Sequence, residues 1–177
     1  MGKEAVLIID VQKAFCDATT FRQAFSALRT MEGVEWDVGP NQCSAARIRD
    51  FAAAARGKIP LIWTGVHPAG HGYERWEGEP LSSGPGMFYL AHPDVAAGDA
   101  VFYKNENNAF DNKALGEYLR QQGVEKIHLA GMNYHACVAE TACGGREAGF
   151  EVNVLYDLTS TIINIPRMIE DAESHME

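Results

Sequence analysis

Three residues that could act together on a substrate each come at or soon after the end of an apolar stretch: Asp10, Lys104 and Cys137. A cysteine thiol is mostly protonated near neutral pH and needs help to attack a substrate. A nearby lysine ammonium lowers the pKa of a thiol, and a carboxylate can take its proton and later return it to a leaving group. This combination predicts acyl transfer to water through a thioester, with ammonia or an amine leaving.

The position of Cys137 in the chain also favours its ionisation. Residues 126–131 form an apolar run that predicts a buried strand, and the alanine-rich residues 137–148 predict a helix that ends at Gly149. Unpaired backbone N–H groups and the positive end of the helix dipole favour a thiolate at such a helix start. The backbone N–H groups between Asn133 and Cys137 could also hold an oxyanion.

Each of these residues also has a purely structural interpretation. A single cysteine in an apolar helix more often packs than reacts, and we expect Cys143, in the body of the same helix, to pack. Asp10 could cap a helix or form a turn, and Lys104 could be a surface lysine after an edge strand. Their shared placement at strand ends favours the catalytic interpretation.

Apolar runs alternate with helical patterns along the chain, which predicts the fold. The expected strands are residues 5–9, 60–66, 100–103, 126–131 and 150–156, and the expected helices are residues 41–56, 111–122, 137–148 and about 166–174. Apolar strands without alternation are typical of parallel sheets covered on both faces. We therefore predict a three-layer, doubly wound, mostly parallel α/β sheet of Rossmann-like type, with Asp10, Lys104 and Cys137 at one edge. Residues 21–40 are expected to be irregular, and the glycine- and proline-rich residues 67–98 to form a binding loop or lid.

Composition restricts the classes of function. The 177 residues suit a single domain spanning residues 1–177, and the formal net charge of −9 argues against nucleic-acid binding. No apolar run reaches the ~20 residues that cross a bilayer, and the N-terminus does not resemble a secretion signal, so we expect a cytoplasmic protein without membrane contact. The four cysteines are scattered, which indicates neither a disulfide framework nor a zinc ribbon.

Three motifs in register resemble the isochorismatase-like cysteine hydrolase superfamily, which includes nicotinamidases, N-carbamoylsarcosine amidohydrolases, maleamate amidases and isochorismatases. Residues 10–15 fit its D-x-Q-x-x-F pattern, residues 104–110 are similar to its K-x-x-x-S-A-F, and residues 131–141 fit G-x-x-x-x-x-C-V-x-x-T. Residues 84–86 also resemble the glycine turn before the lysine strand. The resemblance covers roughly residues 5–159.

The resemblance implies a sheet of about six strands and a catalytic triad of Asp10, Lys104 and Cys137. It also implies a cis peptide bond between Met132 and Asn133, which would aim the Asn133 N–H at the oxyanion beside that of Cys137. Because relatives commonly assemble, we expect a homo-oligomer.

The chain departs from the family at the metal site that nicotinamidases carry. His67 and His71 fit the histidine positions, but Gly65 stands where the aspartate would fall. We therefore expect no metal and no other cofactor, with His67 and His71 as the candidate ligands if a metal binds and Glu74 as a possible substitute acid.

Residues for substrate binding are expected around the same crevice. Phe15, Trp63 and Trp76 could stack on a planar amide, although core packing explains Trp63 equally well. Tyr134 and His135 either line a polar substrate pocket or pack.

Several functions remain open at this level. The favoured one is cofactor-independent hydrolysis of an amide or related C–N bond of a small molecule. Hydrolysis of a vinyl ether like isochorismate is the alternative within the family, and a catalytically silent, oligomeric binding module is the alternative outside enzymology. A dinucleotide-binding oxidoreductase is set aside because no Gly-x-Gly-x-x-Gly follows any strand.

Overall fold

Five parallel strands form the centre of the molecule in the computed structural model, which describes residues 2–24, 37–66, 95–96, 98–162, 170–171 and 173–174. The strands are β1 (Lys3–Ile9), β2 (Leu61–Val66), β3 (Ala100–Lys104), β4 (Val124–Met132) and β5 (Glu151–Ser160). They lie in the order β3-β2-β1-β4-β5, and all four neighbouring pairs are parallel. The predicted doubly wound parallel α/β fold is thus confirmed, with five strands in the described part of the chain where the family resemblance implied about six.

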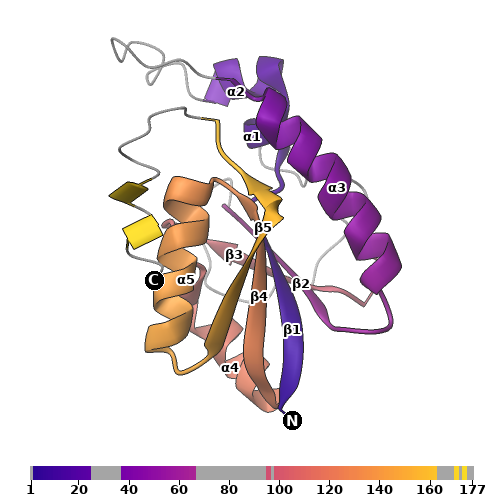
Figure 1. Cartoon of the computed structure of the whole chain (residues 1–177), viewed down its shortest axis with the longest axis vertical. Coiled ribbons are helices and arrows are strands. Elements are labelled where there is room, and N and C mark those ends of the chain that lie inside the picture. The colour runs from indigo at the N-terminus through magenta and orange to yellow at the C-terminus, as the bar shows by residue number, and fades with distance from the viewer. Residues whose placement is uncertain are drawn as a thin grey trace.

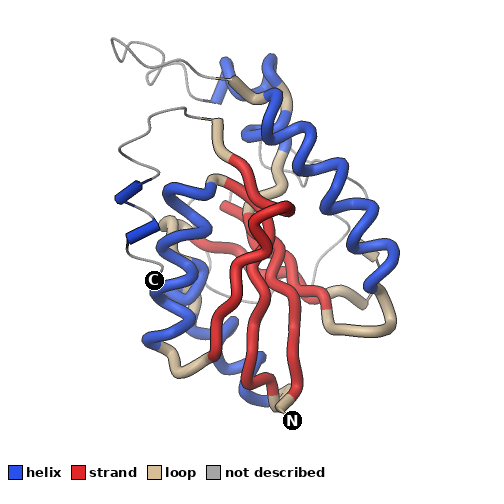
Figure 2. The backbone as a smooth tube through the Cα atoms, in the orientation of Figure 1, coloured by secondary structure: helices blue, strands red, loops and turns tan. Residues whose placement is uncertain are grey.

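Helices cover both faces of this sheet (Figures 1 and 2). The long helix α3 (Gly39–Ala55) lies on one face, and α4 (Lys113–Gln121) and α5 (Ala139–Glu147) lie on the other. The shorter elements are α1 (Lys13–Cys16), α2 (Ala18–Ala24), the 3-10 turn η2 (Ala109–Asp111) and the π-helical turn η3 (Tyr134–Val138). No helix in these residues is both long and apolar enough to cross a membrane.

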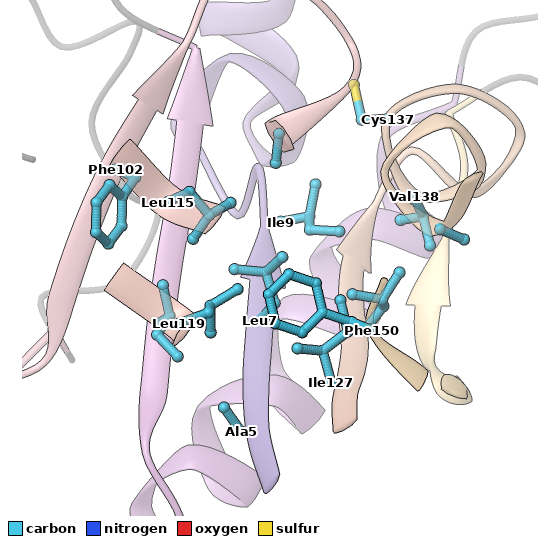
Figure 3. Packing of buried hydrophobic residues seen from close by; sticks show 14 of the residues in the cluster. Ala5, Leu7, Ile9, Phe102, Leu115, Leu119, Ile127, Cys137, Val138 and Phe150 are labelled. Carbon is cyan, nitrogen blue, oxygen red and sulfur yellow. The ribbon is translucent and has the colours of Figure 1, made fainter. Parts of the chain in front are cut away.

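The alternation of side chains along β1 divides the core into two clusters. Leu7 and Ile9 point to the α4 and α5 face, where Figure 3 shows them close to Leu115, Leu119 and other buried side chains. Burial of each such aliphatic side chain contributes about 1.5–3 kcal/mol. Because both faces of β1 are covered, its sequence is a continuous apolar run.

The second cluster fills the space between the sheet and α3. Val6 and Ile8 of β1 pack there with Ile48 of α3, Phe15 of α1 and Trp63 of β2. These contacts hold the N-terminal helices against the sheet near the end of β1.

The close approach of β1 and β4 depends on Gly131. This residue pairs with Ile9, and a Cβ added to it would lie 2.0 Å from the Ile9 carbonyl oxygen. Its φ of 123° lies in the region that glycine adopts without steric cost. Gly131 therefore lets β4 run alongside β1 up to the point where the chain turns toward Cys137.

Several element boundaries differ from the sequence-based expectations. The helix α2 (Ala18–Ala24) extends into residues 21–40, which were expected to be irregular, and β5 continues to Ser160 instead of ending near residue 156. Helical structure after β4 begins at Tyr134, earlier than the expected start at Cys137. The expected last helix is described only at residues 170–171 and 173–174, which are helical.

Candidate active site

A buried ion pair joins two of the predicted site residues at the carboxyl edge of the sheet. Lys104 Nζ, at the end of β3, lies 2.9 Å from Oδ2 of Asp10, which directly follows β1. Both side chains are almost inaccessible to solvent, at 1% and 0% exposure. Lys104 Nζ also donates to the Glu106 carbonyl at 3.0 Å. Asp10 has a φ of 53°, so its backbone is in the left-handed region.

Cys137 completes this group from the turn after β4. Asp10 and Lys104 both act on the pKa of its thiol, and the residue is 5% exposed. In Figure 3 its sulfur points away from the hydrophobic side chains below it. Strand order changes direction between β1 and β4, and such a switch point is where open α/β sheets form their ligand crevice. The structure therefore brings Asp10, Lys104 and Cys137 together.

Burial and the neighbouring charges shift the pKa values of all three side chains. Burial raises the pKa of the Cys137 thiol to about 12, and the Asp10 carboxylate adds to this effect while Lys104 opposes it. Burial likewise raises the pKa of Asp10, against the opposing effects of the Lys104 charge and the Cys137 hydrogen bond. Burial alone would lower the pKa of Lys104, but the Asp10 and Cys137 charges and hydrogen bonds together raise it. The pKa of Cys137 therefore shifts upward, opposite to the expected lowering, because burial outweighs the Lys104 charge and Asp10 adds to the burial effect.

The chain reaches Cys137 through a tight, irregular turn. The peptide bond between Met132 and Asn133 is cis. The Asn133 carbonyl then accepts hydrogen bonds from the N–H groups of Ala136 at 3.1 Å and Val138 at 3.2 Å. The second of these is the five-residue spacing of a π-helix, a geometry that is frequent at functional sites. Cys137 therefore lies within the first helical turn and not at its start.

A buried asparagine that the sequence analysis missed holds this turn in place. Asn41, in the first turn of α3, donates through Nδ2 to the Phe15 carbonyl and to Asn133 Oδ1, both at 3.0 Å. Its Oδ1 accepts from Ser160 Oγ at 2.7 Å, and the Ile162 N–H donates to Asn133 Oδ1 at 3.3 Å. The polar start of an alanine-rich helix is the only sequence signal for Asn41, and it does not reveal these distant partners.

The predicted substrate-binding residues fall into two groups. Phe15, Tyr134 and His135 lie in segments adjoining the site, and Phe15 and Tyr134 are mostly buried in the two hydrophobic clusters. His135 is half-buried, which lowers its pKa, and its Nδ1 pairs with Thr161 Oγ1. Trp63 is 1% exposed within the α3-facing cluster.

Trp63 has a hydrogen-bonding partner remote from the carboxyl ends of the strands. Its indole N–H donates to Asp99 Oδ2 at 3.0 Å, next to the start of β3. The structure thus places Trp63 as a core residue, the alternative interpretation of its sequence.

Three of the predicted residues fall outside the described part of the chain: Trp76, His67 and His71. Glu74 and the glycine turn at residues 84–86 do so as well. Within the described residues, no group of three or more His, Cys, Asp or Glu side chains is arranged to hold a metal ion.

Comparison with known proteins agrees with the fold. The chain is 27% identical over 176 residues to a nicotinamidase/pyrazinamidase of Mycobacterium tuberculosis, covering 89% of this chain and 87% of the relative. It is 28% identical over 192 residues to a nicotinamidase of Escherichia coli, covering 89% of this chain and 83% of the relative. An isochorismatase family protein of Desulfovibrio vulgaris has the same fold, with a TM-score of 0.72 at 21% identity over 99% of this chain and 90% of its own.

A family model for the isochorismatase domain matches residues 4–164, which include the sheet except for the first residue of β1, and the Asp10, Lys104 and Cys137 group. On this match, the chain belongs to the isochorismatase-like cysteine hydrolase superfamily.

Proposed function

We propose that the chain is an amidohydrolase that cleaves an amide or related C–N bond of a small molecule, with Cys137 as its nucleophile. The observation that carries this proposal is the buried Asp10–Lys104 ion pair, both of whose members act electrostatically on the Cys137 thiol. The nicotinamidase names of the two relatives support an amide as the bond that is cleaved.

The reaction begins with transfer of the Cys137 proton to Asp10 as the sulfur attacks the substrate carbonyl carbon. The tetrahedral intermediate then breaks its C–N bond, and Asp10 gives the proton to the leaving nitrogen, which departs as ammonia or an amine. A water molecule attacks the remaining thioester and gives one proton to Asp10. When the C–S bond breaks, that proton returns to the Cys137 sulfur and the acid product leaves.

Lys104 lowers the energetic cost of the proton transfer in a buried site. With a thiol, a carboxylate and an ammonium, the group of three carries no net charge, and moving the proton from Cys137 to Asp10 leaves that total unchanged. Loss of the proton to bulk water would instead leave a net negative charge in a low-dielectric environment. Asp10 is therefore the proton acceptor, and the N–H groups of Asn133 and Cys137 are proposed as donors to the oxyanion.

The proposed reaction needs no cofactor, since the three side chains supply the nucleophile, the proton acceptor and the compensating charge. The partner is a small-molecule substrate, without nucleic acid or membrane. We also propose a homo-oligomer in the cytoplasm; light scattering after size exclusion gives the mass that tests the assembly.

Replacement of the nucleophile tests the proposal. A screen for ammonia release over nicotinamide, maleamate, carbamoyl amino acids and biuret-like compounds identifies a substrate for the wild-type chain. Cys137→Ala should then lower turnover by at least ~1,000-fold, because removal of a covalent nucleophile leaves only binding and oxyanion stabilisation.

Cys43→Ala is the matched control, since Cys43 is exposed on α3 and should leave turnover unchanged. Circular dichroism verifies that both variants are folded. Ammonia release by folded Cys137→Ala at the wild-type rate would overturn the assignment. Conversion of a vinyl ether without ammonia release would favour the isochorismatase-type alternative.

A further inference from the structure

An asparagine in the loop after β3 makes direct contact with the proposed nucleophile. Cys137 Sγ donates to Asn107 Oδ1 at 3.5 Å, within the range of a hydrogen bond to sulfur. Asn107 falls at an unspecified position of the motif at residues 104–110, and the group of Asp10, Lys104 and Cys137 does not include it. The contact offers the thiol proton an acceptor other than the Asp10 carboxylate.

A carboxylate on α5 fixes which end of the Asn107 amide faces the sulfur. Asn107 Nδ2 donates to Glu140 Oε1 at 2.6 Å. An ionised carboxylate can only accept hydrogen bonds, so it requires the NH2 end of the amide and leaves the carbonyl end for Cys137. Glu140 thus determines that Cys137 meets an acceptor and not a donor.

The backbone of the same loop is attached to α5 independently of these side chains. Thr141 Oγ1 accepts from the Ala109 N–H at 3.0 Å and donates to the Asn107 carbonyl at 3.4 Å. Gly144 packs so closely that a Cβ there would lie 2.3 Å from Asn108 Oδ1. The Asn107 side chain can therefore be changed while the loop stays in place.

We propose that Asn107 and Glu140 are positioning residues that hold the resting Cys137 as a protonated thiol aimed at Asn107 Oδ1 until substrate enters. The proposal rests on the role of Cys137 as nucleophile and adds a control on its protonation. A thiol held in this way reacts slowly with alkylating agents and oxidants, whose target is the thiolate.

Other titratable groups surround Cys137 and must be separated from this effect. Asp10 at the end of β1 and Lys104 at the end of β3 act on it directly. Glu106 lies in the same loop as Asn107 and contributes its backbone carbonyl to Lys104, and His135 lies in η3 beside Cys137. None of these is altered by the substitutions below.

Alkylation of Cys137 by iodoacetamide as a function of pH tests the proposal. The modified peptide is quantified by mass spectrometry so that Cys43 and Cys143 do not interfere. Asn107→Leu removes the acceptor and should raise the alkylation rate about threefold at pH 7.5, as expected for loss of one weak hydrogen bond to the neutral form. Asn107→Asp places a carboxylate beside the sulfur and should slow alkylation.

Glu140→Gln lets the amide rotate and present its NH2 group to the sulfur, so alkylation should again become about threefold faster. Because this change also removes a charge, the double variant Asn107→Leu/Glu140→Gln separates the two causes. If Glu140 acts through the amide, the double variant equals Asn107→Leu alone; if it acts through its charge, the effects add. Glu147→Gln, at an exposed position later in α5, is the control and should match the wild type.

Alkylation profiles of Asn107→Leu and Glu140→Gln that superimpose on the wild-type profile would overturn the proposal, and so would additive effects in the double variant. Asn107 and Glu140 are both exposed, and thermal unfolding verifies that each variant is folded. Alkylation requires no substrate, so these outcomes are independent of whether Cys137→Ala abolishes ammonia release.

Discussion

At the scale of single residues, Asp10 has two opposite effects on the nucleophile. Its negative charge raises the pKa of Cys137 and so disfavours a free thiolate, yet it is also the proposed acceptor of the thiol proton. The two effects are compatible because the proton never needs to leave the group of three side chains. Reactivity toward substrate and reactivity toward a simple alkylating agent should therefore respond differently to loss of this carboxylate.

Asp10→Asn should separate these two reactivities. The variant leaves Lys104 as an uncompensated cation, so the pKa of Cys137 should fall and alkylation at pH 7.5 should become at least ~10-fold faster. Turnover should nevertheless fall about 100- to 10,000-fold, because no base remains to accept and return the proton. Iodoacetamide labelling and ammonia release measure the two rates on the same preparation.

Asp50→Asn, at an exposed position on α3, is the control for loss of one carboxylate and should change neither rate. Slower alkylation in Asp10→Asn would contradict the assigned charge balance.

The meeting of Asp10, Lys104 and Cys137 at one edge could be predicted from the sequence, but the direction of the Cys137 pKa shift could not. Each of Asp10, Lys104 and Cys137 is marked by a preceding apolar run, and parallel topology places such positions at one edge. The pKa of Cys137 depends on burial and on the 2.9 Å pairing of the other two residues, and neither quantity can be read from spacing.

At the scale of elements, the site depends on how closely β4 can run beside β1. Among the described glycines with positive φ, Gly131 is the one whose added Cβ would overlap a neighbouring strand. The strands themselves were predictable, because buried parallel strands are continuous apolar runs. The cis bond after Met132 was implied by the family resemblance alone, and the π-helical turn was not foreseen, since no apolar period distinguishes it from an α-helix.

Gly131→Ala should destabilise the protein by more than about 4 kcal/mol, the range of severe core defects, or prevent soluble expression. The added methyl group would lie 2.0 Å from the Ile9 carbonyl oxygen, in addition to the cost of a positive φ. Gly149→Ala is the matched control, because Gly149 also has a positive φ of 91° but has no atoms within 4 Å of an added Cβ. It should cost only about 1–2 kcal/mol in urea unfolding. Equal losses in the two variants would mean that backbone conformation alone, and not the approach of β1, accounts for Gly131.

At the scale of the whole molecule, the two layers of helices meet the site through polar contacts between distant parts of the chain. Asn41 connects α1, the turn after Met132 and the end of β5. Asn107 connects the loop after β3 with α5 in a similar way. Such contacts carry no periodic signal in the sequence, which explains why the fold was predictable and these supporting residues were not.

Asn41→Ala should lower the free energy of unfolding by about 3 kcal/mol, because it removes the hydrogen bonds that Asn41 makes to the Phe15 carbonyl, Asn133 Oδ1 and Ser160 Oγ. The turn that carries Asn133 also loses its hydrogen bond to α3, so turnover should fall at temperatures where the variant remains folded. Urea unfolding and ammonia release measure the two effects. Gln42→Ala, at the exposed neighbouring position, should stay within about 0.5 kcal/mol of the wild type. Full activity in folded Asn41→Ala would show that the hydrogen bonds of Asn41 contribute to stability only.

The left-handed backbone at Asp10 limits which acids this position accepts. Aspartate and asparagine enter that conformation more readily than longer side chains, because their short polar groups can bond locally. A glutamate would carry the same charge, but it adopts the left-handed backbone conformation less readily. Its longer side chain would also need space in a region where Asp10 and Lys104 are already fully buried. The length of the acid is thus selected by the main chain before any substrate is bound.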